Sequence, residues 1–251
     1  MLLSENYFCV EVWIWIILIM CLIILIIGMM CQFFSPDIDK FIKEKKIEMI
    51  DMNEIMNEIE DGDVMLFTGN TFGEKNCKWF TGNIFSHVGF LFRERNPESR
   101  EDIVYIFECD LGQRRRDGVR IMELKDKLDK YIGYRTGALK KLVVSDSKKR
   151  PSYQDIMKLV EKYEGIKFDG KFMTWFTAGY YGLYNLFKDQ KKMFCSELVA
   201  SMYQDLGIIK KDRLASWYSP GNFHLNDLNF EDGYSLGKTY FFNFPKSETK
   251  K

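Results

Sequence analysis

The stretch Met193–Ala200, MFCSELVA, opens an apolar-periodic run that predicts a helix. Apolar residues recur at helical spacing after Cys195, and Gly207 follows as a natural stop. Cys195 therefore falls in the first helical turn, where free backbone N–H groups and the positive end of the helix dipole favour a thiolate. A thiolate is a nucleophile. The competing interpretation is a structural cysteine, because free cysteine is among the most buried residue types.

A nucleophilic cysteine needs a base, and the chain has only 2 histidines. The segment Ile84–Phe92 has the composition of a strand, and alternation places His87 and Gly89 on one face of it. The segment Ile103–Cys109 predicts the next strand, with Glu108 on one face. Two adjacent strands can therefore bring a carboxylate and an imidazole side by side.

Composition limits the classes of partner and cofactor. The chain has 251 residues and a formal net charge of zero, which argues against a nucleic-acid partner. Its 6 cysteines are widely spaced and form no C-x-x-C pair, which argues against a disulfide framework and a structural zinc site. We therefore expect no metal and no other cofactor. The sequence leaves the oligomeric state open.

The N-terminal segment, residues 1–36, predicts a membrane anchor. No charged side chain lies between Glu11 and Asp37, so residues 12–34 are apolar for long enough to form a single transmembrane helix. No Lys or Arg precedes the span, while four lysines follow it: Lys40, Lys43, Lys45 and Lys46. The positive-inside rule then places the C-terminal bulk on the cytosolic side, a reducing compartment that agrees with free thiols.

The remaining chain predicts a tether, a domain and a tail. Residues 37–60 predict one amphipathic tethering helix, residues 61–245 a domain, and residues 246–251 a polar tail. Strands are expected at 64–67, 84–92, 103–109, 118–121, 139–144 and 234–244. A helix should follow Pro151, capped by Ser152 and Asp155, and the aromatic segment 172–187 should be a further helix lining the site. Residues 68–81 and 214–223 are expected to be loops, and 114–116 a basic turn. This mixture predicts the α+β class.

The order of these features, a histidine strand, an acid strand and a later cysteine helix, resembles circularly permuted papain-like hydrolases. These are the NlpC-type superfamily members of the YiiX/YebB kind, found in bacteria, poxviruses and other large DNA viruses. The lecithin:retinol acyltransferase group is a more distant relative with the same order. The resemblance covers residues 61 to 225. The segments that carry it are Gly62–Leu66, Ser86–Gly89, Phe107–Glu108, Gly165–Asp169, Phe194–Val199, and Ser219–Gly221 with Phe223.

The resemblance implies a permuted papain-like domain whose antiparallel sheet packs on the nucleophile helix. It implies that Cys195 attacks a carbonyl carbon and that His87 pairs with the thiolate and later protonates the leaving group. Glu108 would orient His87, with Asp110 as the alternative third residue. The backbone N–H of Cys195 is a candidate oxyanion donor, and the second donor is left unassigned.

The expected function is that of a membrane-anchored thiol hydrolase or acyltransferase acting on an amide or ester carbonyl through an acyl-enzyme. The membrane tether and the aromatic residues favour a lipid or lipidated substrate. One alternative is a cysteine peptidase or peptidoglycan-type amidase. Another is a catalytically inactive, membrane-tethered binding or structural protein of the same fold. A host or virion membrane is compatible with either.

Overall fold

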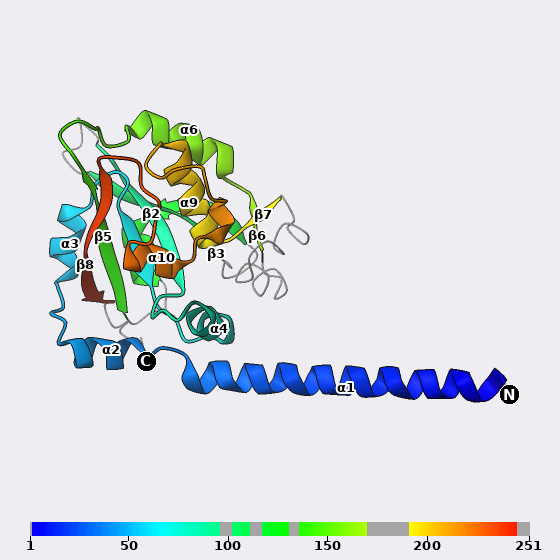
Figure 1. Cartoon of the computed structure of the whole chain (residues 1–251). Coiled ribbons are helices and arrows are strands. Elements are labelled where there is room, and N and C mark those ends of the chain that lie inside the picture. Colours follow the sequence, from blue (N-terminus) through cyan, green and yellow to red (C-terminus); the bar gives the residue numbers. More distant parts are fainter. Residues whose placement is uncertain (1, 96–101, 111–116, 131–135, 170–190, 245–251) are drawn as a thin grey trace.

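A six-stranded antiparallel sheet forms the centre of the computed structural model (Figure 1), which describes residues 2–95, 102–110, 117–130, 136–169 and 191–244. The strand order is β4-β3-β2-β1-β5-β8. The strands are β1 (Val64–Phe67), β2 (His87–Glu94), β3 (Ile103–Asp110), β4 (Gly118–Glu123), β5 (Thr136–Val144) and β8 (Tyr234–Asn243). Two short strands, β6 (Lys167–Phe168) and β7 (Lys192–Met193), pair in parallel beside it.

Helices follow and precede these strands. They are α1 (Leu2–Phe34), α2 (Ile38–Lys45), α3 (Met52–Glu58), α4 (Phe72–Thr81), α5 (Leu124–Lys130), α6 (Tyr153–Tyr163), α9 (Cys195–Asp205), the 3₁₀ turn η1 (Ala215–Trp217) and α10 (Pro220–Leu225). The α+β class and the large antiparallel sheet predicted from the sequence are confirmed.

The sheet is buried on both faces because helices cover each of them. On one face, α9 and α6 pack against apolar side chains that include Val88 and Phe90 of β2. On the opposite face, Leu91 of β2 packs with residues of α3 and α5, among them Ile55 and Leu128. This alternation is the one predicted from the sequence of β2, so His87 and Gly89 share the face of Leu91.

Three predictions about local structure were wrong. Residues 37–60 form two short helices, because Lys46 adopts a left-handed conformation that ends α2 and Asp51 caps the start of α3. Residues 68–81 are not a loop throughout: Thr71 and Glu74 form a capping box that starts α4. Cys77 lies on this helix and is buried.

The segment 214–223 also contains helix. Ser219 and Asn222 form a capping box, and Pro220 occupies the first turn of α10, where its missing N–H costs nothing. Three features predicted from sequence lie outside the described residues: the aromatic segment 172–187, the basic turn 114–116 and the tail 246–251.

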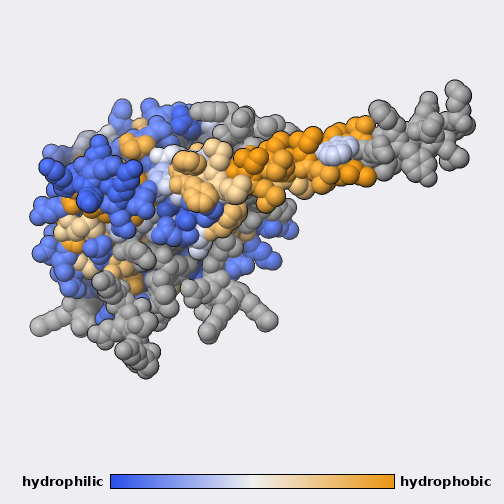
Figure 2. Space-filling view, turned by 90° about the horizontal axis from the view of Figure 1, so that it is seen from below, coloured by the Kyte–Doolittle hydropathy of each residue, from blue (hydrophilic) through white to orange (hydrophobic). Residues whose placement is uncertain are grey.

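Helix α1 is long and apolar enough to cross a membrane, and its most apolar window is not buried against the domain. It extends away from the domain in Figure 1, and most of the coloured part of its surface is hydrophobic in Figure 2. The last turns of α1 pack against α4, where the Phe72 ring lies 3.8 Å from the position that a Cβ on Gly28 would occupy. Helix α1 and the domain therefore meet at α4.

Asp63 joins three parts of the domain at the start of β1. Its fully buried carboxylate accepts hydrogen bonds from Glu60 N (3.0 Å), Leu142 N (2.8 Å) and Arg150 Nη1 (3.1 Å). Burial raises the pKa of Asp63 to about 6, and these hydrogen bonds limit the rise. The carboxylate thus holds the bulge of β5 and the start of the α6 segment against β1.

We expect Asp63→Ala to lower the free energy of unfolding by about 2 kcal/mol, because it removes one of the acceptors of the partly buried Arg150 and leaves the Leu142 N–H unsatisfied. Thermal unfolding of the full-length chain in detergent, followed by circular dichroism, measures the change. Glu58→Ala is the matched control: its carboxylate pairs with Lys141 at the surface and should leave the midpoint unchanged. Equal midpoints for the two variants would contradict this role of Asp63.

Candidate active site

His87 and Cys195 lie at the beginnings of their elements. His87 is the first residue of β2, and Cys195 is the first residue of α9, which packs on β2 and β3. Both side chains are buried. Because Nε2 of His87 faces Glu108, the remaining ring nitrogen, Nδ1, is the one available to the Cys195 thiol that contacts the ring.

The charge of His87 is set by these two neighbours. Burial disfavours the imidazolium ion, but the electrostatic interaction and hydrogen bond with Cys195, together with Glu108, raise the pKa of His87 to about 10. The protonated ring is therefore stabilised on both sides, by sulfur at one nitrogen and by a carboxylate at the other.

Both carboxylate oxygens of Glu108 have cationic or ring N–H partners. Oε2 lies 2.8 Å from His87 Nε2, while Oε1 accepts from Lys127 Nζ at 2.6 Å and from Arg120 Nη2 at 3.1 Å. Burial alone would raise the pKa of Glu108, but the Lys127 ammonium group and the bond to His87 outweigh it and hold the pKa well below its usual range. Glu108 therefore stays a carboxylate that fixes the ring of His87.

The cations around Glu108 were missed by sequence reasoning. Lys127 on α5 is fully buried and also contacts Asp110 Oδ2 at 3.2 Å. Arg120 lies directly across from Glu108 in the β3–β4 register and contacts the same Asp110 oxygen at 3.4 Å. The sequence nevertheless held a signal for each cation. Arg120 lies on the strand that pairs with the strand of Glu108. Lys127 follows Leu124 by three residues and precedes Leu128, so it lies on the apolar side of its helix. Asp110 thus contacts the cations that Glu108 also binds.

Three side chains of this group, His87, Glu108 and Asp110, bring possible metal-ligand atoms within 4.8 Å of one another. The fit to a metal ion is poor, because the Lys127 ammonium and Arg120 guanidinium groups already bind the carboxylate oxygens. A divalent cation would have to lie against those two positive charges. The arrangement suits an ion-pair network around His87.

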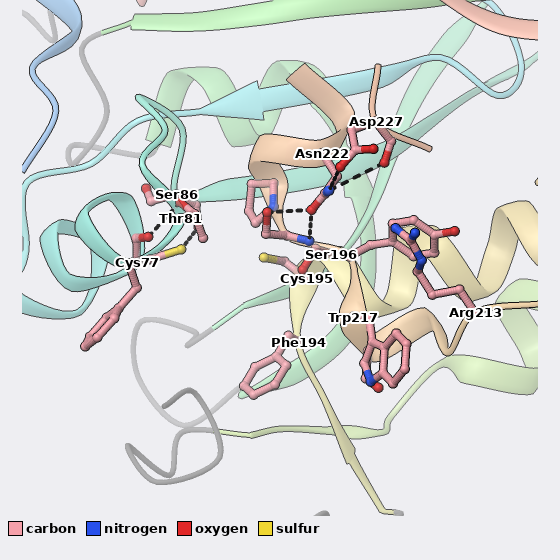
Figure 3. A pocket seen from close by; sticks show the side chains of 15 residues that line it. Cys77, Thr81, Ser86, Phe194, Cys195, Ser196, Arg213, Trp217, Asn222 and Asp227 are labelled. Atoms are coloured by element: carbon pink, nitrogen blue, oxygen red, sulfur yellow. Dashed lines mark hydrogen bonds between the residues drawn. The ribbon is translucent and has the colours of Figure 1, made fainter. Parts of the chain in front are cut away.

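A cavity of about 280 Å³ adjoins Cys195. Its walls come from α4, η1, α10 and the start of α9, and include Cys77, Phe80, Phe194 and Trp217. In Figure 3 the sulfurs of Cys77 and Cys195 face one another across this space. A substrate carbonyl in the cavity would therefore lie beside the sulfur of Cys195.

The other cysteines of the described domain have different surroundings. Burial and the neighbouring Cys195 raise the pKa of Cys77, so it remains a thiol. Cys109 donates to the Met193 carbonyl at 3.2 Å, on the strand face opposite Glu108, and burial raises its pKa as well. Among these three, Cys195 is the cysteine at a helix start with an imidazole partner.

The start of α9 leaves donors for a developing negative charge. Its N-cap residue is Phe194, which makes no side-chain hydrogen bond to the first turn. The Cys195 N–H keeps its place as an oxyanion donor candidate. His224 has a structural role: it packs edge-on against Phe85, and burial lowers its pKa to about 4.

No protein-family model and no curated protein matches the chain. Among solved structures, the chain is similar to a protein from Escherichia coli O157:H7 described as the metalloprotein YiiX. The identity is 18% and the TM-score 0.37, over 59% of this chain and 66% of that one. The match thus spans slightly less than two thirds of YiiX. The chemistry proposed below rests on the residues of this chain.

We expect Lys127→Met to lower the free energy of unfolding by about 3–5 kcal/mol near neutral pH, because it leaves Glu108 without its closest cation in a dry site. Lys125→Met on the same helix is the matched control, since Lys125 is exposed. Thermal unfolding of the full-length chain in detergent measures both. Similar midpoints for the two variants would show that Lys127 does not balance Glu108.

The effect of Lys127→Met should depend on pH. The lowered pKa of Glu108 contributes stability above its ordinary pKa of about 4.3, and that stability is lost as the pH falls through the folded-state value. Without Lys127 the pKa of Glu108 is lowered less, so part of this stability is missing wherever Glu108 is ionised. The difference between the variant and the unsubstituted chain should therefore be full above about pH 5 and narrow as the pH falls below about 4.3. A constant difference would contradict the assignment.

Proposed function

We propose that the chain is a thiol-dependent hydrolase or acyltransferase that acts on an ester or amide carbonyl, with Cys195 as nucleophile. The observation that carries the proposal is the continuous series of contacts from Cys195 to His87 and from His87 to Glu108, beside a cavity. We further propose that the domain is of the permuted papain-like type. The order of its three polar residues and the packing of α9 on the antiparallel sheet support this.

The proposed reaction has two steps. The Cys195 thiolate attacks the carbonyl carbon, and His87 gives its proton to the leaving alcohol or amine as the C–O or C–N bond breaks. The product is a thioester on Cys195. In the second step His87 takes a proton from water or an acceptor alcohol or amine, which attacks the thioester and restores the thiolate–imidazolium pair. Glu108 holds the ring throughout.

The substrate class that we propose is a lipid or a lipidated molecule. Phe80, Phe194 and Trp217 give the cavity apolar walls, and α1 is long and apolar enough to keep the domain at a membrane. The lysines that follow α1 favour a cytosolic position for the domain. Peptide amides are the competing substrates. A binding protein without turnover is the competing function, and the acyl-enzyme experiment below separates it from an enzyme.

Because the pKa of His87 lies near 10, we expect alkylation of Cys195 by iodoacetamide to change little between about pH 6 and about pH 8. In His87→Ala the rate should instead rise with pH, as for an ordinary thiol that titrates near about 8.5. Peptide mass spectrometry of the full-length chain in detergent gives both rates. Cys109, which is fully buried, is the internal control and should remain unmodified. Identical profiles with and without His87 would exclude the ion pair.

A p-nitrophenyl fatty-acyl ester should place its acyl group on Cys195, detectable as added mass after rapid acid quenching. We expect His87→Ala to slow turnover by about 10²- to 10⁴-fold, the usual contribution of general acid–base catalysis. Cys195→Ala should carry no acyl group. Small peptide amides tested in parallel decide between the substrate classes. Failure of every ester and amide to acylate Cys195 would favour the binding protein.

A further inference from the structure

Helix α4 connects the membrane anchor to the catalytic cavity. At its first residue, the Phe72 ring contacts α1 beside Gly28. In its last turns, Cys77, Phe80 and Thr81 line the cavity that holds Cys195. A helix of 10 residues is about 15 Å long, so the cavity lies within about that distance of the anchor.

The level of α4 relative to a bilayer follows from the position of Gly28. Gly28 belongs to the uncharged run that ends before Asp37, and α1 continues to Phe34, about 9 Å beyond it along the axis. An uncharged helix of this length fills the hydrocarbon core of about 30 Å. Phe72 therefore contacts α1 at a depth that belongs to the bilayer or its boundary, rather than to bulk water.

Apolar side chains on α4 are exposed where such a bilayer would lie. Phe72 is 58% exposed and Phe80 is 40% exposed, although the second also lines the cavity. In Figure 2 the hydrophobic surface of α1 runs up to the point where this helix meets the domain. An exposed apolar helix side that continues an apolar span fits lipid chains better than a soluble protein partner.

The cavity is small for a whole lipid. Its volume of about 280 Å³ lies at the lower limit of small-molecule sites. It can hold the reacting carbonyl and the adjoining part of a chain, while the remainder must stay outside. An exit beside Phe80 and α1 would leave that remainder in the bilayer, so a lipid need not be extracted completely.

We propose that α4 lies in the membrane interface beside α1, and that the substrate is a membrane lipid whose ester- or amide-linked acyl chain reaches Cys195 from the bilayer along Phe72 and Phe80. The chemistry in this inference rests on the proposed function. The position of α4 does not, because it follows from the contacts of α1, α4 and the cavity.

Photocrosslinking tests the position of α4 without turnover. Full-length Cys195→Ala is reconstituted into phosphatidylcholine vesicles that contain a phosphatidylcholine with a diazirine in one acyl chain, and crosslinked peptides are identified by mass spectrometry. We expect lipid adducts on residues 72–81 as well as on α1. Phe72→Glu should reduce the α4 adducts by about five- to tenfold, because a carboxylate is disfavoured at this depth.

Two further variants keep the test decisive. Val143→Glu, an exposed valine on β5 outside the cavity lining, should leave the α4 adducts unchanged. Phe72→Ala should reduce them without adding a charge beside α1, which guards against a folding defect in Phe72→Glu. Adducts confined to α1 would overturn the inference, even if soluble esters acylate Cys195. Adducts on α4 without any acyl-enzyme would uphold the membrane position and overturn the proposed function.

Discussion

The site depends on one buried carboxylate, that of Glu108. A carboxylate with no solvent contact is tolerated only when cations and donors replace its water. Here Lys127 and Arg120 bind one oxygen and His87 binds the other. With Asp110 included, two carboxylates face two permanent cations. A proton can then move between Cys195 and His87 without changing the net charge of the group, so that neither state is penalised by an uncompensated buried charge.

The sheet determines how these groups meet. His87 and Glu108 lie on the face covered by α5, whereas α9 packs on the opposite face. The Cys195 sulfur and the His87 ring can nevertheless meet, because each belongs to the first residue of its element. There, at the end of strand β2, the sheet no longer separates the two faces. On the α5 face, Gly89 leaves room for Ile106, whose side chain would be 2.5 Å from a Cβ there. A larger residue at Gly89 would displace the side chain of Ile106 and thereby disturb the position of Glu108 on the same strand.

Sequence periodicity predicted the elements that carry His87, Glu108 and Cys195, because strand alternation and helix spacing are local properties. It did not predict the counter-ions. Lys127 lies in a short, highly charged segment, and although its spacing from Leu124 is a weak signal of a buried helix side, the packing of α5 on the sheet is what makes it a buried cation. The capping box at Thr71 and Glu74 was a local signal for α4 that the surrounding polar composition concealed. Between α2 and α3, Met49 pairs with Phe241 of β8, a distant contact that local periodicity does not predict.

In the proposed reaction, α1 and the ion-pair network contribute from different sides. Burial strengthens the pairing of the imidazolium with its two partners. The cavity beside them has apolar walls at Phe80, Phe194 and Trp217, which can pack against an acyl chain, while Arg213 and Asp227 also line it. On the proposed route, the carbonyl end would bind at the start of α9, while α4 and α1 would set where the chain approaches. A membrane-bound acyl substrate is therefore the proposed class for which burial of His87 and Cys195 and a membrane position of the domain would serve one purpose.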